Sequence, residues 1–251
     1  MVGPLQAALW SLKPDLVAVS GDLTQRARRS EFEQARAFLD SLPRPQIVVP
    51  GNHDIPMDNV MVRFLLPLAA YRRHITRDLA PFYTDEEIAV AGVNTARSLT
   101  IKSGRINQRQ VTGVYNRLCV LSPRVTRIIV THHPFEIPEG YHEGWLVGRA
   151  HMAMQQLAAC GADVFLAGHL HVSFTGHTAA RYQICGHSAL VVQAGTAIST
   201  RGRGEWNSFN VLRIEHPVIH VEQFAWRERN SAFAPVNREQ FRHTPEGWVP
   251  A

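Results

Sequence analysis

Four short stretches of this sequence end a run of apolar residues with side chains that could hold a metal ion. They read GD, GNHD, THHP and GHLH, and together they supply carboxylate, amide and imidazole groups. The candidate residues are Asp22, Asn52, His53, Asp54, His132, His133, His169 and His171. Imidazole combined with carboxylate suits zinc, iron, manganese or cobalt rather than calcium or magnesium alone. The residue types therefore predict a transition-metal site.

The same residues divide into ligands and a proton donor. Asp22 has a carboxylate that can bridge two cations, whereas Asn52 offers a neutral amide oxygen and so leaves the site positively charged for an anionic substrate. Two cations about 3.5–4 Å apart would clamp a phosphate and lower the pKa of a bound water. We expect His53 to be a non-ligand that donates a proton or a hydrogen bond, with Asp54 fixing its tautomer.

A scaffold has to bring these stretches to one place. Apolar β-type runs precede each of them, and segments with helical spacing, such as residues 29–42 and 107–121, lie between them. This alternation predicts an α/β fold with a parallel sheet, in which ligands bind outside the carboxyl ends of the strands. From residue 181 onward, strand-like runs follow one another and predict hairpins in a second sheet. We expect one domain over residues 1–225 and a polar, irregular tail over residues 226–251.

Length and composition are those of an ordinary globular protein. The chain has 251 residues, of which 45% are hydrophobic and 19% charged. No apolar run approaches the ~20 residues of a membrane span, and the N-terminus lacks the features of a signal peptide, so we expect a cytoplasmic protein without a membrane partner. The net charge of +5 comes mostly from scattered arginines, which are compatible with an anionic substrate and form no block typical of a nucleic-acid arm. Cys119, Cys160 and Cys185 form no C-x-x-C pair and are expected in the core.

The segments GDLT, GNHD, THHP and GHLH, in this order, resemble the motifs of the calcineurin-like metallophosphoesterase superfamily. AGTAIST and RGEWNSFN resemble its bacterial cyclic-nucleotide phosphodiesterase branch, and the likeness covers roughly residues 10–225. The resemblance implies a four-layer α-β-β-α sandwich and two divalent metals per site, with manganese, iron or zinc as candidates. It also implies that His132 rather than His133 is a ligand, that Asp22 bridges the metals, and that His53 lies over the phosphate. The implied ligands are Asp22, Asn52, His132 and His169, with His171 on the other metal.

One motif of the family is missing. The family opens with a strand that ends in D-x-H and supplies two ligands to the first metal, and no D-x-H occurs in this chain. Either the start lies too far downstream or the chain works with half a site. We expect the fold to lack the first strand, which leaves an edge beside residues 15–21 unpaired. One metal would keep four ligands and the other only Asp22 and His171, so we expect one metal to be bound firmly.

These residues and the resemblance together predict a metal-dependent phosphodiester hydrolase, with cyclic nucleotides as the first candidate substrate. One alternative is a nuclease of the same superfamily, which would need a long cationic groove that the scattered arginines do not suggest. The other is a non-catalytic interaction module with a degraded metal site. The missing D-x-H favours that module, whereas the retained His53, Asp54 and GHLH histidines oppose it. A small-molecule phosphodiester is the expected partner, and assembly into a homo-oligomer stays open.

Overall fold

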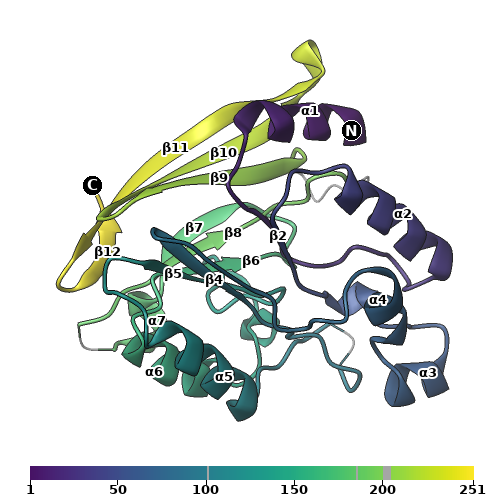
Figure 1. Cartoon of the computed structure of the whole chain (residues 1–251), viewed down its shortest axis with the longest axis horizontal. Helices are drawn as coiled ribbons and strands as arrows, with labels where there is room; N and C mark the ends of the chain where they lie inside the picture. The colour runs from purple at the N-terminus through teal and green to yellow at the C-terminus, as the bar shows by residue number, and fades with distance from the viewer. Residues whose placement is uncertain (101, 185, 200–204) are drawn as a thin grey trace.

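The structure is a computed structural model that describes residues 1–100, 102–184, 186–199 and 205–251 (Figure 1). Its helices are α1 (Val2–Leu12), α2 (Arg29–Asp40), α3 (Val60–Leu65), α4 (Ala69–His74), α5 (Gln108–Leu118), α6 (Ala150–Ala159) and α7 (Ala179–Tyr182), with 3-10 turns η1 (Asn52–Asp54), η2 (Glu143–Trp145) and η3 (Glu228–Asn230). Its strands are β1 (Val17–Val19), β2 (Gln46–Val48), β3 (Phe82–Thr84), β4 (Ile88–Gly92), β5 (Thr126–Val130), β6 (Val164–Ala167), β7 (Phe174–His177), β8 (Leu190–Gln193), β9 (Ser208–Glu215), β10 (Val218–Arg227), β11 (Ala232–Thr244) and β12 (Gly247–Pro250).

The strands form two large sheets and one parallel pair. The six-stranded sheet has the order β3-β4-β5-β6-β8-β7, with a parallel centre and antiparallel edges at β3 and β7. The second sheet is antiparallel, with the order β12-β11-β10-β9. The pair consists of β1 and β2, and among the described residues β1 has β2 as its sole partner strand. The edge expected beside residues 15–21 is therefore unpaired within the described part of the chain.

The two large sheets pack face to face and carry helices on their outer sides. Val130 and Val192 of the six-stranded sheet share a buried cluster with Ile219 and Val221 of the four-stranded sheet. Helices α5 and α6 cover the other face of the six-stranded sheet, and α1 lies against the outer side of the four-stranded sheet (Figure 1). The order helix, sheet, sheet, helix confirms the expected four-layer α-β-β-α sandwich.

Local sequence explains where the helices begin and which face they bury. Asn107 caps α5, since its side chain accepts a hydrogen bond from the backbone N–H of Gln110 while the Gln110 side chain accepts one from the N–H of Asn107. Val111, Val114 and Leu118 then recur at helical spacing and are buried against the sheet. The amphipathic pattern read from residues 107–121 therefore corresponds to a real helix.

The last residues do not form the irregular tail that their polarity suggests. Residues 232–244 form β11, residues 247–250 form β12, and the expected boundary at residue 225 falls inside β10. Trp248 is buried, and its indole Nε1 donates a hydrogen bond to Oδ1 of Asp163 at 2.8 Å. The expectation was wrong because the long β11 exposes most of its side chains, so its composition resembles that of a loop.

Two further expectations concern burial and membranes. Cys160 lies in the core as expected, whereas Cys119 is exposed, and Cys185 lies outside the described residues. Cys119 is the C-cap of α5, beyond the buried face of that helix, which explains why its small apolar side chain is not covered. Among the described helices, none combines the length and the apolar character needed to cross a bilayer.

Candidate metal centre

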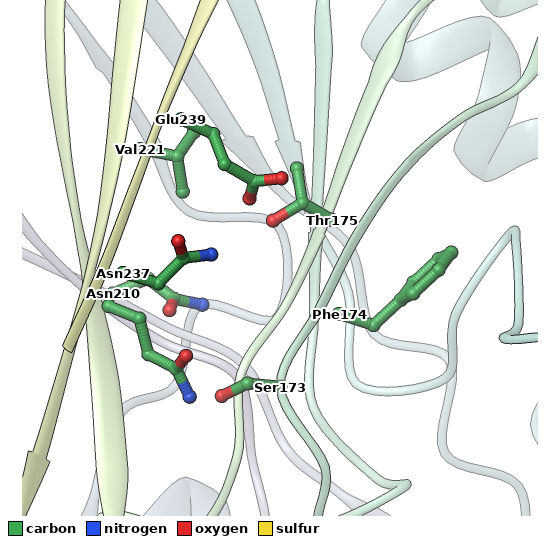
Figure 2. Close-up of a pocket in the computed structure, with 8 residues that line it drawn as sticks. Ser173, Phe174, Thr175, Asn210, Val221, Asn237 and Glu239 are labelled. Atoms are coloured by element: carbon green, nitrogen blue, oxygen red, sulfur yellow. The ribbon is translucent and has the colours of Figure 1, made fainter.

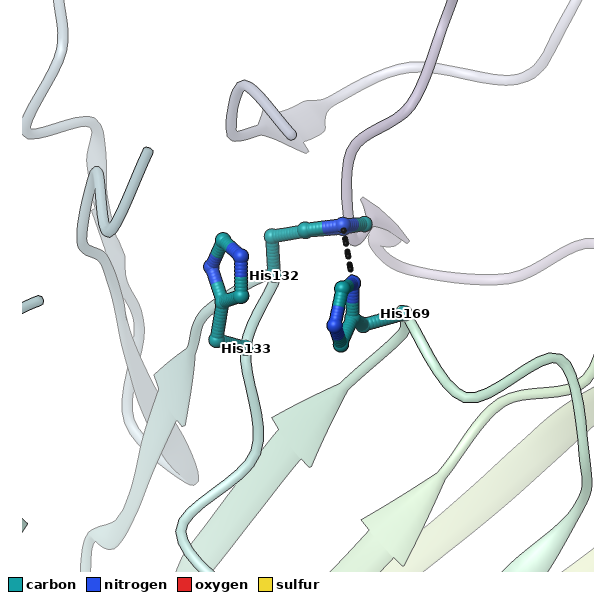
Figure 3. Close-up of side chains that lie close together, drawn as sticks. All are labelled: His132, His133 and His169. Atoms are coloured by element: carbon teal, nitrogen blue, oxygen red, sulfur yellow. Dashed lines mark hydrogen bonds between the residues drawn. The ribbon is translucent and has the colours of Figure 1, made fainter. Parts of the chain in front are cut away.

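The polar stretches meet at the carboxyl ends of their strands. Asp22 follows β1, Asn52 follows β2, His132 follows β5 and His169 follows β6. Figure 3 shows the rings of His132 and His169 facing each other with the ring of His133 beside them, and the ligand atoms of the three residues lie within 4.8 Å of one another. The fold thus gathers side chains that are up to 147 positions apart in the sequence (Asp22 to His169).

The Nε2 atom of His132 is the centre of the arrangement. It lies 3.0 Å from Oδ1 of Asn52, 3.2 Å from Nδ1 of His169 and 3.4 Å from Oδ1 of Asp22. Nδ1 of the same ring lies 2.7 Å from the carbonyl oxygen of Ser20 and donates its hydrogen there. In its neutral form the ring directs an Nε2 lone pair at a carboxylate oxygen and an amide oxygen, and in its protonated form it donates the Nε2 hydrogen to them. A metal ion can take the place of that hydrogen, and this set of carboxylate, amide and imidazole donors fits a divalent transition metal.

The ionisation states of the side chains at this site are compatible with binding a cation. Burial acts to raise the pKa of Asp22, but His132 and His53 outweigh it and hold that pKa well below its usual range. Burial acts to lower the pKa of His132, and the Asp22 carboxylate more than reverses this effect. Burial, together with a positive charge on His132, lowers the pKa of His169 to about 3. At neutral pH, Asp22 is thus ionised and His169 is a neutral imidazole, the forms that bind metals.

His53 is placed beside these groups but is held by a different residue than expected. Its backbone N–H donates to Oδ1 of Asp22 at 3.0 Å. Its ring Nδ1 lies 2.9 Å from the carbonyl oxygen of Gln25, which accepts the Nδ1 hydrogen and leaves Nε2 as the nitrogen for chemistry. The expectation that Asp54 fixes the tautomer of His53 is therefore wrong. Backbone carbonyls carry no sequence signal, which explains why the residue pattern missed Gln25.

Asp54 instead joins the ends of β1 and β2. Its carboxylate accepts hydrogen bonds from the backbone N–H groups of Gly51 at 2.9 Å, Leu23 at 3.3 Å and Thr24 at 3.0 Å, and from the Thr24 hydroxyl at 3.1 Å. The side chain is fully buried. Because η1 is a tight turn, its neighbouring side chains diverge, so Asp54 points into the protein while His53 reaches the partly exposed side. Asp54 thus shapes the site without touching its open face.

His133 belongs to the histidine group but both of its ring nitrogens are engaged elsewhere. Nδ1 lies 2.9 Å from the hydroxyl of Thr95, and Nε2 donates to the carbonyl oxygen of Lys102 at 3.0 Å. The Thr95 hydroxyl also accepts the backbone N–H of His133, so it donates its own hydrogen to Nδ1. Burial holds the pKa of His133 well below its usual range. This network supports His132 as the ligand and His133 as a structural residue.

Comparison with known proteins names the family. A model of calcineurin-like phosphoesterases matches residues 4–173, which is more than half of the chain. This chain belongs to the calcineurin-like phosphoesterase family. The family expected from the motifs is confirmed.

Two proteins similar to this calcineurin-like phosphoesterase add detail. A stretch of 42 residues is 45% identical to glycerophosphodiester phosphodiesterase GpdQ of Enterobacter lignolyticus (strain SCF1), and this match spans 17% of the present chain and 15% of that protein. The crystal structure of a dimetal phosphatase from Danio rerio superposes with a TM-score of 0.65 at 13% identity, covering 97% of this chain and 89% of that one. The second likeness shows that the two chains share a fold.

The phosphoesterase site also contains residues that the motifs did not indicate. The ring of Trp145 lies with its centroid 5.7 Å from that of His169, and Tyr141 meets Trp145 edge-on at 6.2 Å. Both aromatic residues come from the irregular segment around η2, which follows no period in the sequence. His171 follows His169 in the same loop, and its charge affects the pKa of His169, although it is not part of the group of three histidines.

The backbone around the ligands adopts conformations that most residues avoid. Asp22, His169 and His171 have positive φ angles of 55°, 76° and 62°. Such angles cost free energy in non-glycine residues and tend to occur where function requires a particular geometry. Gly51 has an ordinary φ, but a Cβ atom there would overlap the Asp22 carboxylate. The close approach of β1 and β2 at the site therefore requires glycine at this position.

We expect Gly51→Ala to weaken metal binding by about 10–100-fold, the range typical for lost support of a ligand, because the added methyl displaces the Asp22 carboxylate. Gly113→Ala is the matched control. A Cβ at Gly113 meets nothing within 4 Å and lies in α5, where alanine should stabilise by about 0.5–1 kcal/mol. Metal titration of both variants gives the comparison, and equal affinities would show that the Asp22 carboxylate can shift without cost.

A separate cavity of about 210 Å³ lies between β7 and the four-stranded sheet. Figure 2 shows Asn210, Asn237, Glu239 and Thr175 directing polar atoms toward the same space, while Phe174 points away from it. None of the histidines of the metal centre lines this cavity. It is therefore described separately from the candidate metal centre.

Proposed function

We propose that this protein hydrolyses phosphodiesters with the help of a divalent transition metal. Manganese, iron and zinc are the candidate metals, and Asp22, Asn52, His132 and His169 are the proposed ligands. The observation that supports this most directly is the cluster of lone-pair atoms around Nε2 of His132, which come from four separate segments of the chain. When bound there, a divalent cation would polarise a phosphoryl group and lower the pKa of a water molecule.

The ligand set favours an anionic substrate. Asp22 is the carboxylate among the proposed ligands, and the others are an amide and two imidazoles, which bind a metal in their neutral form. One negative charge against a divalent cation leaves the site net positive, so it attracts a phosphodiester monoanion. The buried His133 and Asp54 hold the surrounding backbone by hydrogen bonds, so the ligands are oriented before the substrate arrives.

We propose His53 as the residue that handles the proton of the leaving group. The Gln25 carbonyl holds Nδ1–H, so a protonated ring presents Nε2–H as its second donor. Donation of that hydrogen to the departing oxygen would balance the negative charge that develops when the phosphorus–oxygen bond breaks. The partial exposure of His53 allows its ring to reload a proton from solvent.

Cyclic nucleotides are the first substrate to test, since AGTAIST and RGEWNSFN resemble the corresponding branch of the family. Part of the second segment, residues 203 and 204, and the last residue of the first lie outside the described residues. The relative from Enterobacter lignolyticus is named for glycerophosphodiesters, which are also diesters. We further propose a cytoplasmic location, which the exposed free thiol of Cys119 supports because exposed thiols persist in reducing compartments.

We expect bis(p-nitrophenyl) phosphate to be hydrolysed with a higher kcat/KM than p-nitrophenyl phosphate. A monoester dianion calls for additional cations at the site, and the nearest arginines that follow β1, Arg26 and Arg28, are both paired with Asp58. Steady-state kinetics on the two esters test this. A clear preference for the monoester would move the assignment to a phosphatase, whereas salt-sensitive cleavage of single-stranded DNA would move it to a nuclease.

A further inference from the structure

Helix α3 buries its charged residue and exposes most of its apolar residues. Its charged residue, Arg63, is 7% exposed, whereas Val60 and Met61 on the same helix are 66% and 71% exposed. In water, a helix normally buries its apolar side chains and exposes its charges. The large apolar side chains exposed here, which we call the α3 patch, are Met57, Val60, Met61, Phe64, Leu65, Leu66 and Leu99. The helix lies at the periphery of the fold, at the lower right of Figure 1.

Arg63 explains how this inverted orientation is held. Its guanidinium donates hydrogen bonds to the backbone carbonyls of Pro56, Ser98 and Thr100, at 3.1 Å, 2.9 Å and 2.6 Å respectively. These bonds fix the inner side of α3 and draw the segment on either side of Leu99 against the helix. Leu99, which is 82% exposed, is therefore held beside α3 as part of one surface.

The exposed residues of α3 share one face. Val60, Met61, Phe64 and Leu65 are spaced i, i+1, i+4 and i+5, which places them on one side of a helix, opposite Arg63. Together with the flanking members, the α3 patch exposes on the order of 800 Å², about what one protein contributes to a standard interface. Contiguous apolar patches of that size are rare on soluble monomers and usually mark an interaction site.

The charges near the α3 patch indicate which partner covers it. Between residues 57 and 66 the charged side chains are Asp58 and the buried Arg63, so the centre of the face has no exposed cation that could contact an anionic lipid surface. At its edge, Asp58 lies 3.5 Å from Arg26 and 3.4 Å from Arg28, so both signs of charge are present there. An apolar centre with a rim of mixed charge can pair with its own copy about a twofold axis.

We propose that the α3 patch is the interface through which two copies of this chain form a symmetric dimer. The proposal does not depend on the reaction that the protein catalyses. Sedimentation velocity across the micromolar range should give a species of twice the chain mass of 28.1 kDa. Replacing Phe64→Glu and Leu65→Glu together buries two charges in the apolar centre and should raise the dimer dissociation constant by more than about 100-fold.

Val120→Glu is the matched control, because Val120 is an equally apolar residue, 80% exposed, that lies beyond the end of α5 and outside the α3 patch. This variant should stay dimeric. Met61→Lys serves as a second disrupting variant if the double variant fails to show wild-type circular dichroism. A monomeric wild-type protein, or a dimer that survives these changes, would refute the proposal. Flotation with vesicles of phosphatidylserine and phosphatidylcholine that depends on Phe64 and Leu65 would assign the face to lipid and overturn it as well.

Discussion

His53→Ala is expected to lower kcat for bis(p-nitrophenyl) phosphate by about 10²–10⁴-fold, the range typical for loss of a general acid, while the metal content stays at the wild-type level. The reason lies in the geometry around this residue. Its ring Nδ1 is occupied by the Gln25 carbonyl, and its contact with Asp22 is made by the backbone N–H, which alanine keeps. Removing the ring therefore removes the proton donor and leaves the hydrogen bond to the proposed ligand in place.

Asn52→Ala tests the complementary expectation, that loss of a proposed ligand lowers the metal content. Oδ1 of Asn52 lies 3.0 Å from Nε2 of His132 and is a proposed ligand, so its loss should lower the metal content measured by plasma emission spectroscopy. His151→Ala, on the exposed side of α6, controls for the loss of a histidine outside the site and should change neither quantity. Equal metal loss in His53→Ala and Asn52→Ala would show that His53 is a ligand. Unchanged kcat in His53→Ala would remove it from the reaction altogether.

Chelation with EDTA is expected to abolish turnover, and manganese is expected to restore it. One equivalent per chain should remain after desalting, because Asp22, Asn52, His132 and His169 offer four donor atoms to one position. The second metal-binding position implied by the family retains only Asp22 and His171 as ligands among the motif residues. Tight catalytic zinc sites, by contrast, usually have three protein ligands plus a water. Millimolar manganese should fill this weaker position by mass action and raise the activity.

Variants of His132 and His171 test the tight and the weak metal-binding position separately. His132→Ala should abolish retention of the tight equivalent, since this residue is the centre of the donor cluster. His171→Ala should keep the tight equivalent and lose the additional activation by manganese. Isothermal titration with manganese measures retention of the tight equivalent without reference to turnover, and steady-state kinetics at rising manganese concentration measure the activation. Two firmly retained metals per chain would contradict this arrangement, and would show that residues outside the four motifs complete the second position.

The strand ends could be read from the sequence because their signal is local. Apolar β-type runs ending in GD, GNHD, THHP and GHLH locate the side chains at the carboxyl ends of parallel strands, Asp22 and Asn52 on the pair β1-β2 and His132 and His169 on β5 and β6. Helices also follow from local spacing, as Val111, Val114 and Leu118 show for α5. Residue type and period were sufficient for these helices and for the strands that precede the motifs.

Tertiary structure decided what each side chain touches. His53 and Asp54 are neighbours in the sequence, yet η1 sends one to the Gln25 carbonyl and the other to the amides around Gly51, so their roles are independent. His132 and His133 are distinguished in the same way, by the partners that surround each ring.

Two features that the residue pattern does not reveal both depend on hydrogen bonds of backbone groups. The exposed β11 is held by its backbone pairing with β10. The inverted α3 is held by hydrogen bonds from Arg63 to the carbonyls of Ser98 and Thr100, 35 and 37 positions further along the chain. All residues carry a backbone carbonyl, and all except proline carry a backbone N–H. The residue type therefore does not indicate which backbone group will form a given hydrogen bond. The sequence by itself determined the family, the strand ends and the set of candidate ligands, whereas the fold determined their orientation, their partners and the face left exposed.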